Sequence, residues 1–249
     1  MLLGEATYKN MVECGVRLTP EQIYNANKSS LKDAIVALGG GFCTGEIISD
    51  QGLMMTNHHC GFGTIQANST TENDYLTNGF WAMSKEQEIP AEFGVWFLNE
   101  ISDVTDIVLK GLNENMNESQ RDSLIRANSN TLKTNAKEGK DKSDFAVQVK
   151  SFYYGNLYYM FTYNIYNDVR LVGAPPSSIG KFGGDTDNWM WPRHTGDFTI
   201  FRVYADKENN PSSYNEYNQP FEPKHSLPVS IAGVQEGDYA MIMGYPGST

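Results

Sequence analysis

The 249-residue sequence has no apolar run of the roughly 18 residues that a membrane-spanning helix needs, and no cluster of basic residues. Its formal net charge is −11, from 19 basic and 30 acidic side chains. An acidic chain without a Lys/Arg patch is poorly suited to bind nucleic acid or an anionic membrane surface. We therefore expect that the protein does not bind nucleic acid and that the chain has no membrane-spanning helix.

Cysteine is scarce. The three cysteines allow one disulfide and leave one thiol over. A disulfide would imply an oxidising compartment, yet no basic, apolar and small-residue leader is visible at Met1. Truncation of a longer precursor would reconcile the two observations. We therefore expect a periplasmic, secreted or cell-surface protein of which this chain is a piece.

The most informative stretch is FCTGEIISDQGLMMTNHHC, which starts at Phe42. Phe42–Ser49 is β-branched and alternating, Leu53–Asn57 is a short apolar run, and turn-forming residues lie at 50–52. These signals predict two strands joined by a turn. Because successive strand residues point to opposite faces, we expect His58 and His59 not to serve one site.

The whole pattern resembles the way in which trypsin-like serine proteases present their general base. By its position before Cys60, His59 matches the catalytic histidine, and His58 is assigned to support or packing. In that fold a disulfide closes the histidine loop, and Cys43 and Cys60 stand at the matching positions, which leaves Cys14 over. Closing a loop of about 16 residues would stabilise the fold by ~3 kcal/mol in the chain-entropy account.

Two other interpretations of this stretch remain open. A lone histidine beside apolar strands is commonly a hydrogen-bonded structural residue. His58, His59 and Cys60 are also all competent metal ligands, but structural zinc sites usually bring a second spaced pair of ligands, which the sequence lacks. We therefore predict no metal and no cofactor.

A second informative stretch is GGDTDNWMWPRHTGDFTIFRVY. Its second half, Asp197–Tyr204, alternates as a strand does. An aspartate at the head of an apolar strand, downstream of the histidine, matches the carboxylate that orients the imidazole in a catalytic triad. Asp197 is the candidate, with Asp187 and Asp185 as alternatives. The competing interpretation is that Asp197 only caps a turn after Gly196.

The remaining sequence predicts a mainly β chain with a few helices. Capping boxes start helices at Thr19-Pro20 and at Ser30, the second running through Ala34–Leu38 to the glycines at 39–41. A polar helix is expected from Asn117 to Ala136. Further strands are expected over 94–99, 104–109, 145–153, 157–163, 166–173 and 239–243, with a two-residue hairpin turn at 155–156 and a polar, turn-rich segment over 60–77. Many short strands favour a barrel or sandwich.

Four segments together resemble the bacterial serine dipeptidyl-peptidases of the dipeptidyl-peptidase 7 and 11 type. They are SSLKDAIVALGGGFCTGE, GLMMTNHHCG, GGDTDNWMWPRHTGDFTIFRVYAD and MIMGYPGST. The resemblance implies a chymotrypsin-like double β-barrel with a large helical domain inserted between its halves. It also implies an exopeptidase that removes dipeptides from the free amino terminus of peptides, and a homodimer is the assembly it suggests.

The resemblance assigns roles to individual residues. His59 would be the general base and Asp197 its orienting partner, while Asn188 and Trp189 match the positions that hold the terminal ammonium of the substrate. An amide oxygen can accept an N–H bond, and an indole face attracts a cation by about 0.5–2 kcal/mol. The alternative is that Trp189 and Trp191 are loop packing.

The chain departs from the family pattern at the nucleophile. That serine lies in a Gly-x-Ser-Gly context late in the second half-barrel, and no such motif occurs here; Ser248 is not its match. We therefore interpret the chain as a helical lead-in (1–40) and a first half-barrel (41–249) with a polar helical insertion near 112–144. The second half-barrel and the helical domain would be absent. The alternative is a non-catalytic peptide-binding module or an inactive remnant.

Overall fold

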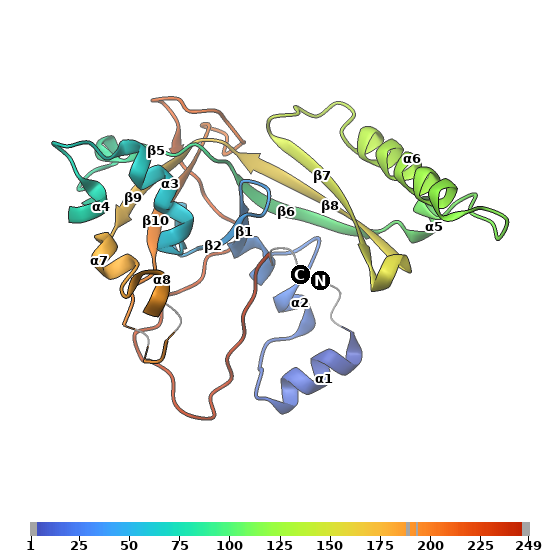
Figure 1. The fold of residues 1–249 in the computed structure, drawn as a ribbon, viewed down its shortest axis with the longest axis horizontal. Coiled ribbons are helices and arrows are strands. Elements are labelled where there is room, and N and C mark those ends of the chain that lie inside the picture. The colour runs from blue at the N-terminus through green and yellow to red at the C-terminus, as the bar shows by residue number, and fades with distance from the viewer. Residues whose placement is uncertain (1–3, 188–189, 193, 246–249) are drawn as a thin grey trace. The chain divides into compact units, whose positions relative to one another are not determined.

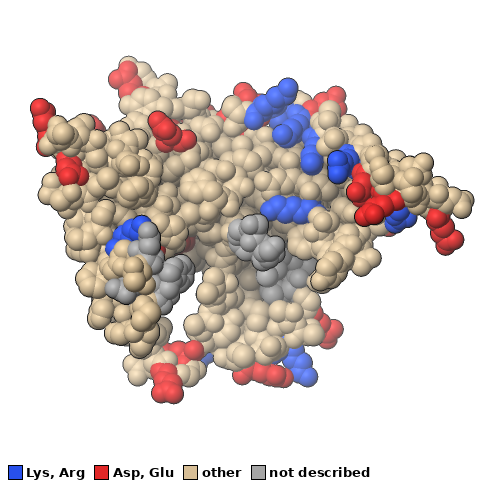
Figure 2. Space-filling model, viewed as in Figure 1, with Lys and Arg blue, Asp and Glu red and all other residues tan. Residues whose placement is uncertain are grey.

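A computed structural model describes residues 4–187, 190–192 and 194–245 (Figure 1). The chain divides into two compact units. We call residues 97–165 the inserted unit, because the chain enters it and returns from it, and the remaining residues the histidine unit. No helix in the described part of the chain is long and apolar enough to cross a membrane. On the face drawn in Figure 2, acidic and basic side chains are interspersed among uncharged ones.

The histidine unit is built on an antiparallel sheet with the strand order β4-β9-β10-β3-β2-β1. Two short strands lie beside this path, β5 on β9 and β11 on β10. Among the described residues the path is open, because its end strands do not pair with each other. The bounds are β1 Ile35–Leu38, β2 Cys43–Ile47, β3 Leu53–Thr56, β4 Phe80–Trp81, β5 Ile89–Pro90, β9 Val169–Ala174, β10 Thr199–Ala205 and β11 Gln219–Pro220.

Short helices accompany this sheet. They are α1 Glu5–Glu13, α2 Pro20–Ile23, η1 Leu31–Ala34, α3 His58–Asn68, α4 Tyr75–Asn78, η2 Lys85–Gln87, α7 Ser177–Gly180 and α8 Gly184–Asp187. The capping box predicted at Thr19 is confirmed, since Thr19 and Gln22 satisfy each other's backbone N–H groups at the start of α2. Helix α1 was not predicted, because its sequence has no strong cap and little apolar periodicity.

The inserted unit holds three strands in the order β6-β8-β7, with two helices between β6 and β7 in sequence. Its elements are β6 Val95–Asp103, α5 Thr105–Val108, α6 Glu118–Ala136, β7 Phe145–Phe152, η3 Tyr153–Gly155 and β8 Leu157–Tyr166. The predicted polar helix is confirmed as α6, where Asn117 and Gln120 form a complete capping box. Leu132 and Ile125 of α6 pack against the small core around Val108, so a sparse apolar stripe is enough to dock this helix.

The prediction of a helix over 31–38 is wrong. Ser30 and Asp33 do form a capping box, but it starts only the 3₁₀ helix η1. The next four residues, Ile35–Leu38, form strand β1, are all buried and pair with β2. A short apolar run suits a buried helix and a buried strand equally well. Here β2 offers a partner for backbone hydrogen bonds, so the run forms a strand. The glycines at 39–41, all with positive φ, form the turn from β1 to β2 rather than a helix end.

Three other expectations also need correction. The expected strand over 104–109 is helix α5, because Asp103 Oδ1 accepts the backbone N–H of Thr105 at 2.9 Å and starts a helical turn. The expected polar segment over 60–77 contains most of α3 and most of α4. The β7–β8 turn spans 153–156 rather than two residues, with positive φ at 153, 154 and 155.

The strand expected over 239–243 does not form. The described residues 239–243 have no strand partner, and Ile242 is fully exposed. Alternating apolar residues favour a strand only where a neighbouring strand can supply the ladder hydrogen bonds. A turn does lie just before this segment, at residues 236–237.

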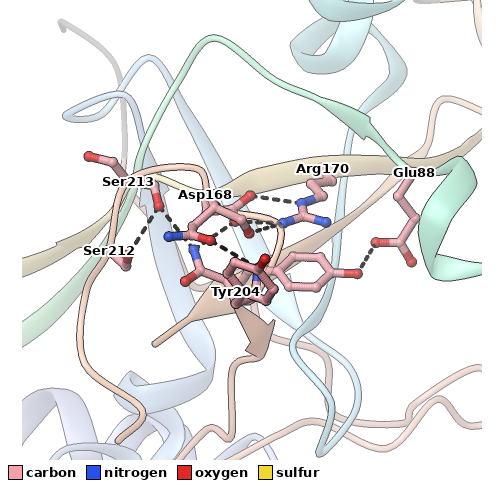
Figure 3. Close-up of polar contacts among 9 residues, drawn as sticks. Glu88, Asp168, Arg170, Tyr204, Ser212 and Ser213 are labelled. Carbon is pink, nitrogen blue, oxygen red and sulfur yellow. Dashed lines mark hydrogen bonds and ion pairs between the residues drawn. The ribbon is translucent and has the colours of Figure 1, made fainter. Parts of the chain in front are cut away.

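A buried ionic network joins the segment after β10 to strand β9 (Figure 3). Asp168 accepts two hydrogen bonds from the Arg170 guanidinium, at 2.8 and 2.7 Å, and a third from Asn218 Nδ2 at 2.9 Å. The guanidinium lies 3.8 Å from the ring centre of Tyr204, whose hydroxyl donates to Glu88 at 2.7 Å. The buried charges of Asp168 and Arg170 are therefore paired with each other, which is the condition under which burial of a charge is tolerated.

We predict that Asp168→Ala destabilises the protein by about 3–5 kcal/mol, because it leaves the Arg170 guanidinium buried without its carboxylate. For a domain of this size that corresponds to a fall in the melting temperature of roughly 10 °C. Thermal unfolding of the full-length protein measures this, with the exposed Glu114→Ala as matched control. A fall no larger than that of the control would show that Arg170 finds other partners.

Candidate active site

His59 and Asp197 meet at the ends of two paired strands. β3 and β10 are antiparallel, with Thr56 opposite Thr199, so the residues just after β3 lie beside those just before β10. His59 Nδ1 is 3.0 Å from Asp197 Oδ2, and the backbone N–H of His59 donates to Asp197 Oδ1 at 3.2 Å. Asp197 was predicted to be the carboxylate beside His59, and the structure brings the two together across 138 residues of sequence.

The contact determines which nitrogen of His59 can act. Ionised carboxylates only accept hydrogen bonds, so Nδ1 carries the proton in the neutral imidazole and Nε2 keeps its lone pair. The His59 side chain is 64% exposed, whereas that of Asp197 is 21% exposed. The arrangement can therefore accept a proton at Nε2 from a group that approaches from solvent.

Asn57 also contacts Asp197 at this site, although the sequence did not predict a role for it. Its side-chain amide donates to the Asp197 backbone oxygen at 3.3 Å and to Oδ2 at 3.1 Å. Asn57 is the N-cap residue of α3, yet its side chain makes no capping bond to the helix. The only sequence signal for this role was an asparagine directly before the two histidines. Asparagine at such a position ordinarily caps the start of a helix.

His58 and His59 begin helix α3 rather than continuing strand β3, so the reason given for separating them was wrong. Consecutive helix residues point about 100° apart, which still separates their side chains. His58 is 1% exposed, and burial lowers its pKa; the nearby Asp197 carboxylate opposes this shift, and His59 adds to it. Neither ring nitrogen of His58 has a hydrogen-bond partner among the described residues.

The predicted disulfide between Cys43 and Cys60 is confirmed, and Cys14 is a free, exposed thiol. The bridge ties the start of β2 to the first turn of α3 and so restrains the backbone that carries His59. The ligand atoms of Cys43, His59 and Cys60 lie within 4.8 Å of one another. Both sulfurs are joined in the bridge, so neither is a free thiolate that could bind a metal ion.

The other predicted residues are placed as follows. Asn188, Trp189 and Ser248 lie outside the described residues. Asp185 and Asp187, the alternatives to Asp197, lie in α8. Trp191 is 87% exposed, so it contributes little to loop packing in the described structure.

Comparison with known proteins places this site in a family. The model of the family described as Peptidase S46 matches residues 2–249. The chain belongs to the peptidase S46 family.

Curated relatives within this family carry two names. The chain is 54% identical over 247 residues to an Asp/Glu-specific dipeptidyl-peptidase of Porphyromonas gingivalis and 52% identical over 250 residues to one of Capnocytophaga gingivalis. It is 48% identical over 251 residues to dipeptidyl-peptidase 7 of Capnocytophaga gingivalis. These matches cover 97%, 100% and 100% of the chain and 34% of each relative. The chain thus spans about one third of the length of these relatives.

Solved structures agree with the sequence comparison. The crystal structure of Porphyromonas endodontalis DPP11 matches with a TM-score of 0.81 at 45% identity, covering 94% of this chain and 34% of that one. The same enzyme in complex with substrate matches with a TM-score of 0.82 at 45% identity, covering 93% and 34%. The mainly antiparallel β architecture is therefore shared with this member of the S46 family.

Proposed function

We propose that the protein carrying this chain is a serine-type dipeptidyl-peptidase that releases dipeptides from the free amino terminus of peptides. In this proposal His59 is the general base and Asp197 orients it. The observation that carries the proposal is the 3.0 Å contact between His59 Nδ1 and Asp197 Oδ2, within a chain about half identical to proteins named dipeptidyl-peptidases.

The proposed reaction is acyl transfer. His59 Nε2 takes the proton of a serine hydroxyl supplied outside these 249 residues, and the serine oxygen bonds to the scissile carbonyl carbon. His59 then gives that proton to the leaving amine as the C–N bond breaks. Water attacks the acyl-enzyme with His59 again as base, which frees the dipeptide and restores the serine. Asp197 stabilises the imidazolium that forms in each half-reaction.

We further propose that the sheet of the histidine unit is the first half of a chymotrypsin-like fold. The order of β2, β3 and α3, the Cys43–Cys60 bridge and the carboxylate at the head of β10 support this assignment. In the same proposal the protein acts in a periplasmic, secreted or cell-surface location and as a homodimer.

Asn188 and Trp189 are the proposed holders of the terminal ammonium of the substrate. A site that fixes this charge at one distance from the scissile carbonyl limits the product to two residues. DPP11 of Porphyromonas endodontalis has been solved with the dipeptides Arg-Glu and Arg-Asp. For this chain we propose peptides with a free amino terminus as the substrate class.

Acetylation of the substrate's amino terminus should lower kcat/KM of the full-length protein at least about 100-fold. Acetylation removes the charge, and one charge-assisted hydrogen bond with a cation–π contact is worth about 3 kcal/mol. The measurement compares free and acetylated fluorogenic dipeptidyl substrates. Acidic residues are placed before the cleaved bond because some relatives are named Asp/Glu-specific, and hydrophobic residues serve as the comparison. Equal rates would indicate an endopeptidase, and binding without hydrolysis would favour the peptide-binding alternative.

A further inference from the structure

The buried His58 ring packs directly on a glycine of helix α7. A Cβ atom added at Gly180 would lie 2.5 Å from His58 Nδ1 and 2.7 Å from Cδ2, distances that real Cβ atoms do not adopt. Gly180 is itself buried and lies at the end of α7. The closeness of α3 and α7 at this point therefore depends on the flat imidazole on one side and the missing side chain on the other.

Helix α7 in turn holds the segment that leads to Asp197. Gly196 N–H donates to the Ile179 carbonyl at 2.9 Å. The Thr195 hydroxyl lies 3.0 Å from the same carbonyl and 3.1 Å from the carbonyl of Gly180. The backbone of residues 195–196 is thus tied to the last turn of α7. Asp197 is the next residue, so its position follows that of α7.

These contacts close a ring around the catalytic pair. His58 and His59 are adjacent at the start of α3, Gly180 packs on His58, and residues 195–196 bond to α7. Asp197 then returns to α3 through His59 and Asn57. A change in the spacing between α3 and α7 at Gly180 would therefore change the distance between the Asp197 carboxylate and the His59 imidazole.

We propose that His58 is a positioning residue that sets the Asp197–His59 geometry through its contact with Gly180. This inference rests on the proposed function, and it assigns a role to the second histidine of the motif that the reaction does not use. His58 acts by the shape of its ring. Both ring nitrogens are buried without hydrogen-bond partners among the described residues, so no polar contact in the described structure explains its presence.

Gly180→Ala in the full-length protein is the first test. We expect kcat to fall about 10- to 100-fold with KM changed less than about threefold, because misplacement of a catalytic group acts on the chemical step. The matched control is Gly63→Ala in α3, where an added Cβ meets nothing within 4 Å.

Two further variants separate positioning from simple loss of folding. Thr195→Val removes the hydroxyl contacts to α7 without adding bulk, and it should lower kcat by a smaller amount, again with little change in KM. His58→Phe keeps a flat ring without nitrogens, so it should retain at least tenfold more activity than His58→Ala. His58→Phe as inactive as His59→Ala would overturn the proposal, and so would an unchanged kcat in folded Gly180→Ala.

A readout that does not need activity keeps this inference distinct from the proposed function. The NMR resonance of the proton between His59 Nδ1 and Asp197 Oδ2, which reports on that hydrogen bond, should change in Gly180→Ala relative to the unsubstituted protein, and not in Gly63→Ala. If the unsubstituted protein hydrolyses no dipeptidyl substrate, the proposed function fails while this resonance still tests the positioning role. If hydrolysis occurs and the resonance does not change, the positioning role alone fails.

Discussion

His59→Ala should reduce kcat of the full-length protein for dipeptidyl substrates by about 10⁴- to 10⁶-fold. The imidazole is the only group that the described structure places against the Asp197 carboxylate with a second nitrogen free to take a proton. Without it the serine must lose its proton to water at the moment of attack. KM should change little, because His59 acts on the transition state more than on the bound substrate.

The control for this experiment is His225→Ala. This histidine lies in the segment after β11, and in the described structure it makes no hydrogen bond or ion pair with His59 or Asp197. His59 is largely exposed, so its removal should leave the melting temperature within about 2 °C of the original value. Steady-state and single-turnover rates measure the chemistry directly. Turnover in His59→Ala within tenfold of the original rate would contradict the assignment of the general base.

Asp197→Asn should lower kcat by about 10³- to 10⁴-fold with little change in fold, since the replacement has nearly the same shape. The amide can donate a hydrogen bond to Nδ1, and this favours the tautomer with the proton on Nε2, which cannot act as base. The loss of the negative charge also destabilises the imidazolium.

Asp185→Asn and Asp187→Asn are the comparison variants, because both aspartates were alternatives for the same role. We assign the role to Asp197, whose Oδ2 lies 3.0 Å from His59 Nδ1, so each of the other two changes should cost less than about tenfold in kcat. A larger loss at Asp187 than at Asp197 would reassign the carboxylate. Single-turnover rates of all three variants provide the second, independent measurement.

Local patterns in the sequence predicted several elements well. The capping residues Thr19 and Asn117 both start helices, because a cap satisfies backbone groups within a few residues and depends little on the rest of the fold. The turn between β2 and β3 and the strand that ends before Pro175 also follow from local chemistry. The resemblance of the histidine motif and of the Asp197 stretch to the family predicted the roles of His59 and Asp197 and the Cys43–Cys60 bridge.

Short apolar runs were less predictable. Ile35–Leu38 forms a strand where a helix was expected, and Val104–Leu109 contains a helical turn where a strand was expected. Residues 239–243 have a strand-like pattern but no partner in the described structure. In each case the local preference is weak, and the presence or absence of a neighbouring strand determines the outcome.

The sequence by itself determined the family, the histidine motif, the capped helices and the type of chemistry that the motif supports. These follow from which residues are adjacent along the chain. Only the tertiary structure decided that Asn57 binds Asp197, that His58 is buried against Gly180, and that α7 holds the segment before Asp197. The first two contacts join residues more than 100 positions apart, and the β3–β10 ladder and close packing bring those residues together. The third joins residues only 15 to 16 positions apart, across an irregular segment whose path no local pattern predicts.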